Sequence, residues 1–322
     1  MKEIGGYFEL EQLISNEYHK GLIQLNTARN ALLYLMKSKK IEKVYIPYYL
    51  CDSVSNMLEK YGYEYEYYRV AADFSPNFHK ELKKQECLYV VNYFGQLSEE
   101  KILCIKEKHK QVIIDNTHAF FQRPLSSIDT IYSCRKFFGV SDGAYLSTDK
   151  KLDEELEIDL SKDRVEHLLG RFEGIASDYY RIFLEVDERF NGETLKKMSR
   201  FTRNLMGAID YENVIQERNN NYSYLDSELK KYNLLNLISP NGPFCYPFYV
   251  GNGLQVRRNL AEKKIYIPTL WKNVSQVTPD ESIEYLYSTN LLPIPCDQRY
   301  DEDDMKYIVE CISLERENKL LI

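Results

Sequence analysis

The first half of the chain alternates short apolar runs with longer amphipathic stretches, and this alternation most constrains the fold. The amphipathic stretches carry apolar residues at helical spacing, which predicts helices. Strand–helix alternation with continuously apolar strands is typical of an α/β fold, in which helices cover both faces of a mostly parallel central sheet. Glu66 stands between tyrosines, which suits a strand nearer an edge. The predicted strands lie at 43–46, 65–68, 87–91, 111–114 and 130–132, and the predicted helices at 28–38, 52–61 and 98–109.

One further strand of this sheet is predicted to be antiparallel. Residues 141–147 place Asp142 and Gly143 between short extended segments, and an Asp-Gly pair in that position indicates a hairpin turn. From about residue 150 to residue 220 the pattern becomes helical and charged.

The second half of the chain predicts a smaller α+β domain. Residues 205–232 read as one long helix, or as two helices broken near Tyr211. Apolar runs at 246–250 and 265–267 and helices at 254–263 and 302–314 follow. Because 322 residues exceed what one hydrophobic core usually serves, we expect a large domain over residues 1–200. A small C-terminal domain with its connecting helix would occupy residues 201–322.

Composition excludes several classes of protein. A net charge of −7 argues against non-specific nucleic-acid binding, which needs a basic face. No apolar run approaches the about 18 residues that a membrane span requires. The seven cysteines include no C-x-x-C pair, so neither a zinc site nor a disulfide framework is indicated. These features fit a cytoplasmic, reduced protein without a bound metal.

Asp115 and Lys136 are the most informative pair of polar residues. Each lies just beyond a predicted strand, Asp115 after the apolar run 112–114 and Lys136 within the segment 133–139. A lysine amine and a buried carboxylate are what pyridoxal phosphate needs: the amine forms a Schiff base, and the carboxylate keeps the pyridine nitrogen protonated. Taken by spacing alone, the pair would more often be a surface lysine and a turn aspartate.

Other polar residues follow predicted strands of the same sheet. Because parallel strands end at the same edge of the sheet, we expect these residues to lie together at the edge where such sheets bind ligands. The segment 27–29 opens the first predicted helix, whose free N–H groups would hold a phosphate together with the Ser133 hydroxyl. Each residue alone has a structural reading: His118 as a core or surface histidine, Ser133 as a cap, and the helix start as an ordinary capped helix. The rim segments are 27–29, 47–51, 92–96, 115–118 and 133–136.

In this order, the segments resemble the DegT/DnrJ/EryC1/StrS family of pyridoxal-phosphate enzymes, which have aminotransferase fold type I. The similarity is clearest over residues 20–150 and continues more weakly through Arg203, 218–222 and 293–300. The segments that carry it are Thr27–Leu32, Ile46–Pro47, Tyr93–Gln96, Ile114–Ala119 and Ser133–Lys136.

The resemblance assigns a role to each matching position. Lys136 matches the Schiff-base lysine and proton shuttle, and Asp115 matches the partner of the pyridine nitrogen. His118 matches the residue beside the ring oxygen. The phosphate-binding positions are Ala28, Arg29 and Ser133.

Several positions depart from the family pattern. Ala28 replaces the usual glycine, and Lys136 lies closer to the serine than is usual. Cys51 stands where an aromatic residue commonly stacks on the ring, so that stacking would pass to Tyr48, Tyr49 or His118. Phe201 replaces an asparagine that often reaches across the dimer, although Arg203 fits the neighbouring arginine. The chain is also short for the family.

The resemblance implies a pyridoxal-phosphate-dependent aminotransferase that forms a homodimer. Its expected substrates are an amino donor, usually glutamate or glutamine, and a nucleotide-linked keto-sugar. The product would serve polysaccharide or glycosylated-metabolite biosynthesis. Two alternatives stay open: another pyridoxal-phosphate reaction of the dehydratase or aldol type, and a non-catalytic regulator or scaffold. Lys136 favours transamination over dehydration, because sugar dehydratases of the family typically have His there. No G-x-G-x-x-G motif supports a nicotinamide dehydrogenase.

Four residues are candidates for contacting the substrates. Tyr7 near the N-terminus and Arg299 near the C-terminus lie in segments that the family places at the entrance of the site. Arg299 would bind the donor carboxylate bidentately, or else pair with Asp301 or Glu302. Tyr7 would pack on a sugar or a base, or serve only in packing. The other two candidates are Tyr48 and Arg203.

Overall fold

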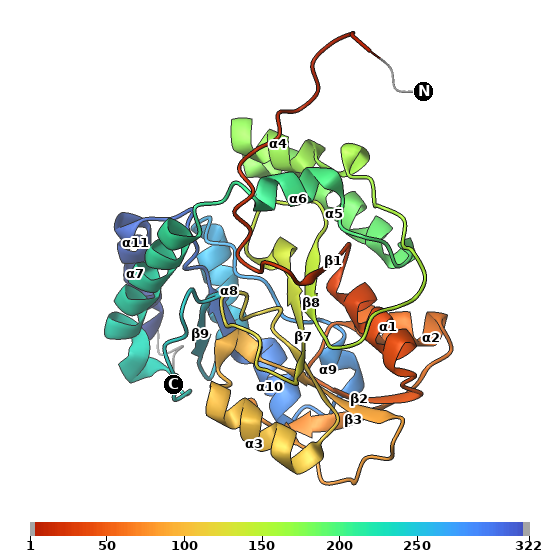
Figure 1. Ribbon diagram of the computed structural model, residues 1–322. Coiled ribbons are helices and arrows are strands. Elements are labelled where there is room, and N and C mark those ends of the chain that lie inside the picture. Colours follow the sequence, from red (N-terminus) through yellow and green to blue (C-terminus); the bar gives the residue numbers. More distant parts are fainter. Residues whose placement is uncertain (1–3, 318–322) are drawn as a thin grey trace.

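The computed structural model describes residues 4–317. Within these residues, the largest sheet has eight strands in the order β1-β8-β7-β6-β5-β2-β3-β4. Figure 1 shows β1, β8 and β7 side by side near the centre of the molecule. The strands are β1 (Ile23–Leu25), β2 (Lys43–Pro47), β3 (Glu64–Val70), β4 (Pro76–Asn77), β5 (Glu86–Val91), β6 (Val112–Asp115), β7 (Asp129–Ser133) and β8 (Ala144–Ser147). The five adjacent strands β7, β6, β5, β2 and β3 run parallel to one another, so the predicted mostly parallel sheet is confirmed.

The burial of the strands follows their place in the sheet. All six residues of β5 are buried, as expected where helices cover both faces. In contrast, β3 is only partly buried, and its outer neighbour β4 has two residues. The predicted near-edge position of the run that contains Glu66 is therefore confirmed.

The predicted antiparallel strand is β8, which pairs with β7 on one side and with β1 on the other. Asp142 and Gly143 do not form a tight hairpin, because the connection from β7 to β8 spans residues 134–143. The Cys134 N–H donates to the Gly143 carbonyl at 3.0 Å, so this longer loop closes where the strands meet. Lys136 lies within the loop.

The helices of the first half begin at residues that cap them. Thr27 accepts a hydrogen bond from the Asn30 N–H at 3.2 Å, and Ser98 accepts one from the Lys101 N–H at 3.3 Å. The first helix packs on β7 and β8, and the third on β6. These helices are α1 (Ala28–Lys39), α2 (Asp52–Lys60) and α3 (Glu99–His109), close to their predicted bounds.

The charged middle of the chain is helical, as predicted. The helices are α4 (Glu166–Glu173), α5 (Tyr180–Arg189), α6 (Arg200–Met206) and α7 (Tyr211–Leu229). Of the two readings of residues 205–232, the broken helix is confirmed. The break lies between Met206 and Tyr211, where the Asp210 side chain accepts from the Asn213 N–H at 3.1 Å and starts α7.

The C-terminal part has its own two-stranded antiparallel sheet within the described residues. Each strand carries a proline, Pro247 opposite Pro293, which an edge strand tolerates. Ile265 and Ile267 pack into the C-terminal core without joining a sheet, and Tyr266 between them is exposed. The elements are β9 (Tyr246–Tyr249), α8 (Gly253–Glu262), α9 (Val274–Val277), α10 (Ile283–Asn290), β10 (Leu291–Ile294) and α11 (Glu302–Glu317).

The C-terminal part contributes to two hydrophobic cores. One core joins α7, α8, α11 and the small sheet. Val274, Tyr287 and Leu291 instead belong to the core around the central sheet. The domain boundary at residue 200 stays a prediction. No described helix is both long enough and apolar enough to cross a membrane.

Candidate active site

The carboxyl ends of β2, β5, β6 and β7 lie at one edge of the sheet, because these strands are parallel. Asp115 is the last residue of β6, and Lys136 ends a short 3-10 turn directly after β7. The charge of Lys136 acts on both Asp115 and His118, so the structure brings these three predicted residues together. The expected convergence on a strand-end rim is therefore present.

Asp115 is buried and held in a fixed orientation. The Tyr89 hydroxyl donates to Asp115 Oδ2 at 2.7 Å, and the Thr117 N–H donates to Oδ1 at 2.9 Å. Burial raises the pKa of Asp115, while the two hydrogen bonds and the charge of Lys136 work in the opposite direction. A cationic partner on a ligand would therefore stabilise this carboxylate strongly.

The side chain of Lys136 reaches solvent, and several charged groups of the protein lie near its amine. Its amine makes no hydrogen bond or ion pair with any residue from 4 to 317. Desolvation by the surrounding protein lowers the pKa of Lys136, and the positive charges of Arg135 and Arg29 lower it further. Cys51 and Asp187 oppose this shift. A lysine with a lowered pKa has more of the neutral amine that attacks an aldehyde.

His118 is buried against aromatic rings. Phe244 stacks on it at 4.2 Å between ring centroids, and Trp271 lies nearly parallel at 5.7 Å. Desolvation lowers the pKa of His118 to about 3, with Lys136 adding to the effect, so its imidazole is neutral. His118 Nδ1 is buried without a hydrogen-bond partner among the described residues. Its ring edge therefore has capacity for a polar group.

The other side of Lys136 is rich in cations. Arg29 is half-buried in the first turn of α1, and its Nη1 donates to Asn191 Oδ1 at 3.0 Å. No carboxylate of the described residues pairs with it, and burial lowers its pKa, with Arg135 adding to the effect. Arg135 itself pairs with Asp187 at 2.8 Å. An unpaired guanidinium at a helix N-terminus favours an anion.

The remaining predicted cofactor positions adjoin these groups. Ala28 is the first residue of α1, and Cys51 immediately precedes α2. The Ser133 hydroxyl makes no hydrogen bond with residues 4–317, so it stays available as a donor. Cys51 is half-buried, and it raises the pKa of both Arg29 and Lys136.

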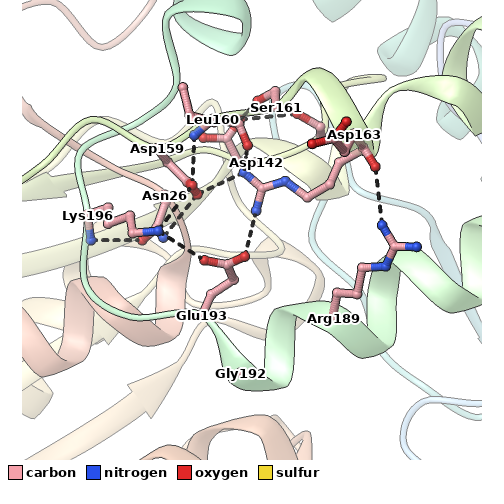
Figure 2. Close-up of polar contacts among 12 residues, drawn as sticks. Asn26, Asp142, Asp159, Leu160, Ser161, Asp163, Arg189, Gly192, Glu193 and Lys196 are labelled. Carbon is pink, nitrogen blue, oxygen red and sulfur yellow. Dashed lines mark hydrogen bonds and ion pairs between the residues drawn. The ribbon is translucent and has the colours of Figure 1, made fainter.

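A buried ionic network fixes the loop that precedes α1 (Figure 2). Asn26 Nδ2 donates to Asp159 Oδ2 at 3.2 Å, and Arg164 pairs with the same carboxylate at 2.9 Å. Glu193 and Lys196 extend the network. The turn at residues 27–29 is thus anchored by residues that lie more than a hundred positions later in the chain.

Asp142 fixes the end of the lysine loop. It is fully buried and has no cationic partner among the described residues; hydroxyl and amide groups satisfy it instead. Ser199 donates from its backbone N–H at 2.8 Å and from its Oγ at 2.7 Å, and Ser161 Oγ donates at 2.9 Å. Thr202 also donates to it.

Several residues of this site were not predicted from the sequence. Tyr89, Asp187 and Asn191 reach it through side chains whose direction depends on register or on distant segments. For Tyr89 a signal existed: β5 and β6 were both predicted, and their pairing sets Val91 opposite Asp115, which brings Tyr89 within reach.

Three residues that were predicted to contact the cofactor, the substrate or a second subunit instead contact other parts of this chain. Tyr48 stacks on Tyr67 at 4.7 Å between ring centroids, and Tyr49 is fully buried against Tyr93. Arg203 lies on α6 and pairs with Glu17 at 3.5 Å.

The two predicted entrance segments differ from each other. Tyr7 is 99% exposed on an extended N-terminal segment that leaves the body of the molecule (Figure 1). Arg299 binds Asp297 bidentately, with Nε at 2.6 Å and Nη2 at 2.8 Å, and not Asp301 or Glu302.

The donor set fits pyridoxal phosphate. Asp115 is a buried carboxylate that forms no ion pair with a described residue, which suits a protonated pyridine nitrogen, and the amine of Lys136, which has no partner among residues 4–317, suits the aldehyde. His118 Nδ1 lacks a partner that the ring oxygen would supply. The unpaired Arg29 and the start of α1 suit the phosphate. Asp115, His118 and Lys136 would hold the ring and its aldehyde, with Cys51 at the face of the ring, while Ala28, Arg29 and Ser133 would hold the phosphate.

Comparison with known proteins gives the fold. No protein-family model matches the chain, and no curated protein does. Solved structures do match. DesV of S. venezuelae, solved with a ketimine intermediate, has a TM-score of 0.60 at 12% identity, and the match covers 92% of this chain and 85% of DesV.

Two further structures match similarly. A DegT DnrJ EryC1 StrS aminotransferase from Brucella abortus has a TM-score of 0.58 at 14% identity, with 91% of this chain and 85% of that chain covered. The PLP form of Spr1654 from Streptococcus pneumoniae, a candidate sugar aminotransferase, has a TM-score of 0.60 at 14% identity, with 89% and 85% covered. The protein therefore has the architecture of aminotransferase fold type I.

Proposed function

We propose that this protein is a pyridoxal-phosphate-dependent aminotransferase that aminates a nucleotide-linked keto-sugar. One observation carries the proposal: a buried carboxylate fixed by two hydrogen bonds, Asp115, faces the same site as an unpaired lysine amine, Lys136. The fold shared with sugar aminotransferases supports it. Polysaccharide or glycosylated-metabolite biosynthesis would be its context.

Each residue of the site has a distinct task in this proposal. When bound, pyridoxal phosphate supplies an electron sink for a carbanion on the substrate. The Asp115 carboxylate would hold a proton on the ring nitrogen, and Tyr89 and Thr117 keep that carboxylate in place. The neutral His118 would donate to or accept from the ring oxygen through Nδ1. Lys136 Nζ would anchor the cofactor and carry a proton to and from the substrate carbon.

Arg299 is our candidate for the carboxylate of the amino donor. Its guanidinium already binds one carboxylate bidentately, that of Asp297, and its side chain is half-exposed. A donor carboxylate would take the place of Asp297 in the same fork geometry. Tyr48 and Tyr7 remain our candidates for packing on the sugar or the base.

We also propose a homodimer. Arg203 is 64% exposed on α6 and available for a contact across a two-fold axis. Leu205 of the same helix lines a surface groove of about 370 Å³, and we propose that a second copy of the chain occupies this groove. Sedimentation should show a dimer, and a monomer with full turnover would contradict this. The groove is lined by Phe138, Gly139, Val140, Leu205, Ala208, Ile209, Val214 and Gln298.

A cytoplasmic location belongs to the same proposal. All seven cysteines are free thiols, which fits a reducing compartment.

An absorbance spectrum combined with Lys136→Ala tests the function. Wild-type protein loaded with pyridoxal phosphate should absorb in the visible, and borohydride should attach the cofactor to Lys136. Lys136→Ala should lose both the covalent link and turnover, because Lys136 is the amine whose charge acts on both Asp115 and His118. Borohydride attachment to a different lysine would refute the assignment.

A further inference from the structure

We propose that Arg218 and Gln298 are positioning residues that hold the Phe137–Phe138 peptide, one residue beyond Lys136, and thereby orient the turn from which its amine extends. This inference rests on the proposed function. Neither residue touches the reacting atoms in the arrangement described above. Both come from the C-terminal part of the chain, Arg218 from α7 and Gln298 from the loop before α11.

Arg218 and Gln298 both donate to the carbonyl oxygen of Phe137, and they also bind each other. Arg218 Nη2 donates to the Phe137 carbonyl at 3.1 Å, and Gln298 Nε2 donates to the same oxygen at 3.0 Å. Arg218 Nε donates to Gln298 Oε1 at 2.7 Å, so each side chain fixes the other. The guanidinium also lies 4.6 Å from the centre of the Phe137 ring. This carbonyl belongs to the Phe137–Phe138 peptide, one residue beyond Lys136, and that peptide cannot rotate without breaking these bonds.

The lysine turn needs such support. From within, it is held mainly through the Cys134 carbonyl, which accepts from the N–H groups of Phe137 and Phe138 at 3.1 and 3.0 Å. The amine of Lys136 itself has no partner among the described residues. The backbone at residues 136–138 therefore sets the Cα–Cβ direction from which this side chain extends.

The burial of Arg218 argues against a purely stabilising role. Its side chain is 1% exposed, and no carboxylate of the described residues forms an ion pair with it. Burial lowers the pKa of Arg218, and the charge of Asp297 only partly opposes this. Burying a cation costs free energy, and an apolar side chain of similar volume is often as stable or more so. The specific geometry of the carbonyl contacts is what an apolar side chain would not supply.

The same arginine also reaches the second polar group of the site. Arg218 Nη1 donates to the Pro243 carbonyl at 2.7 Å, and the next residue, Phe244, stacks on His118 at 4.2 Å. Arg218 thus fixes the peptide that follows Phe137, one residue beyond Lys136, and the peptide that precedes Phe244, whose ring stacks on His118. We infer that it aligns the amine with the neutral imidazole.

Gln298→Met tests the proposal, because methionine keeps the volume and neutrality of glutamine but removes both hydrogen bonds. Gln298 is only half-buried, so its loss should cost less stability than that of Arg218. With pyridoxal phosphate bound, we expect kcat to fall about tenfold or more, with KM changed within about twofold. The pH midpoint of the visible band should move by more than about half a unit.

Asn221→Ala is the matched control. Asn221 also lies on α7 and donates to the carbonyl of Tyr300 at 2.8 Å, so it ties α7 to the same loop without touching Phe137. Urea unfolding should rank the two variants as similarly destabilised, whereas only Gln298→Met should change kcat and the band. Equal kcat and equal spectra in the two variants would overturn the positioning role. A wild-type protein without a visible band would instead overturn the proposed function.

Discussion

The two sides of Lys136 are built differently. On the carboxylate side, Asp115 and His118 are buried, and neighbouring strand ends and aromatic rings hold them rigidly. On the cation side, Arg29 and Arg135 are half-buried, and segments distant in the chain hold them. A fixed, desolvated carboxylate discriminates between protonation states of a ring, whereas half-exposed cations recognise charge and tolerate small displacements. The first side should therefore govern rate, and the second should govern cofactor affinity.

The largest effect should come from Asp115→Asn, which removes the charge of the carboxylate side at nearly constant shape. We expect turnover to fall about 100-fold or more, because the ring nitrogen loses the group that keeps its proton. Rapid-mixing measurement of each half-reaction checks this. Turnover equal to wild type would mean that the two sides do not differ as described.

The stability of the Asp115→Asn protein should not fall with its turnover. Burial raises the pKa of Asp115, so its ionised form destabilises the cofactor-free fold at pH values above that raised pKa. Asparagine carries no such cost. Urea unfolding without cofactor should therefore show equal or higher stability in Asp115→Asn, and a large loss of stability would identify Asp115 as mainly structural.

Arg29→Gln should have the next largest effect, and only on binding. The charge-assisted contact to phosphate is expected to contribute about 1.5–3 kcal/mol, so cofactor affinity should fall about tenfold to a hundredfold. Turnover per loaded site should change little. Pyridoxal, which lacks the phosphate, should bind both proteins equally well.

Arg135→Gln is the control on the same side of the site. Arg135 already pairs with Asp187 and lies 4.2 Å from the ring centre of Phe190, so its charge is largely engaged within the protein. Its loss should weaken cofactor binding less than the loss of Arg29. The reverse order would assign the phosphate contact to Arg135.

The same contrast explains how far the sequence could predict the site. Asp115, His118 and Lys136 were predicted because each follows a recognisable strand, and parallel strands end at one edge. The sheet and the first three helices were predictable because the apolar pattern that indicates each element lies within a few neighbouring residues. The antiparallel direction of β8 was also predicted from its turn residues.

The cation side was less predictable, because its contacts join residues that no local pattern connects. Arg29 meets Asn191, and Arg135 meets Asp187, through packing of a helical segment whose position the sequence does not indicate. The contacts of Arg218 and Gln298 with the turn that contains Lys136 were not predicted either, because these residues are distant from it in the sequence. The prediction of a tight hairpin at Asp142-Gly143 was wrong. Asp142 does not form a hairpin turn; its buried carboxylate accepts hydrogen bonds from the hydroxyls of Ser161 and Ser199.

The smallest effect is expected from Arg299→Lys, which keeps the charge but loses the two-pronged geometry. The apparent Kd of the amino donor should rise about threefold to tenfold, while the half-reaction with the keto-sugar should stay unchanged. Asp297→Asn should act in the opposite direction. Asp297 competes for the same guanidinium, with contacts at 2.6 and 2.8 Å, so weakening it should free Arg299 and lower the donor's Kd. Equal effects of Arg299→Lys on both half-reactions, or no effect of Asp297→Asn, would leave Arg299 as a residue that only fixes the loop before α11. In that case the donor carboxylate would have to be bound by the cation side, and Arg29→Gln would then raise the donor's Kd as well as that of the cofactor.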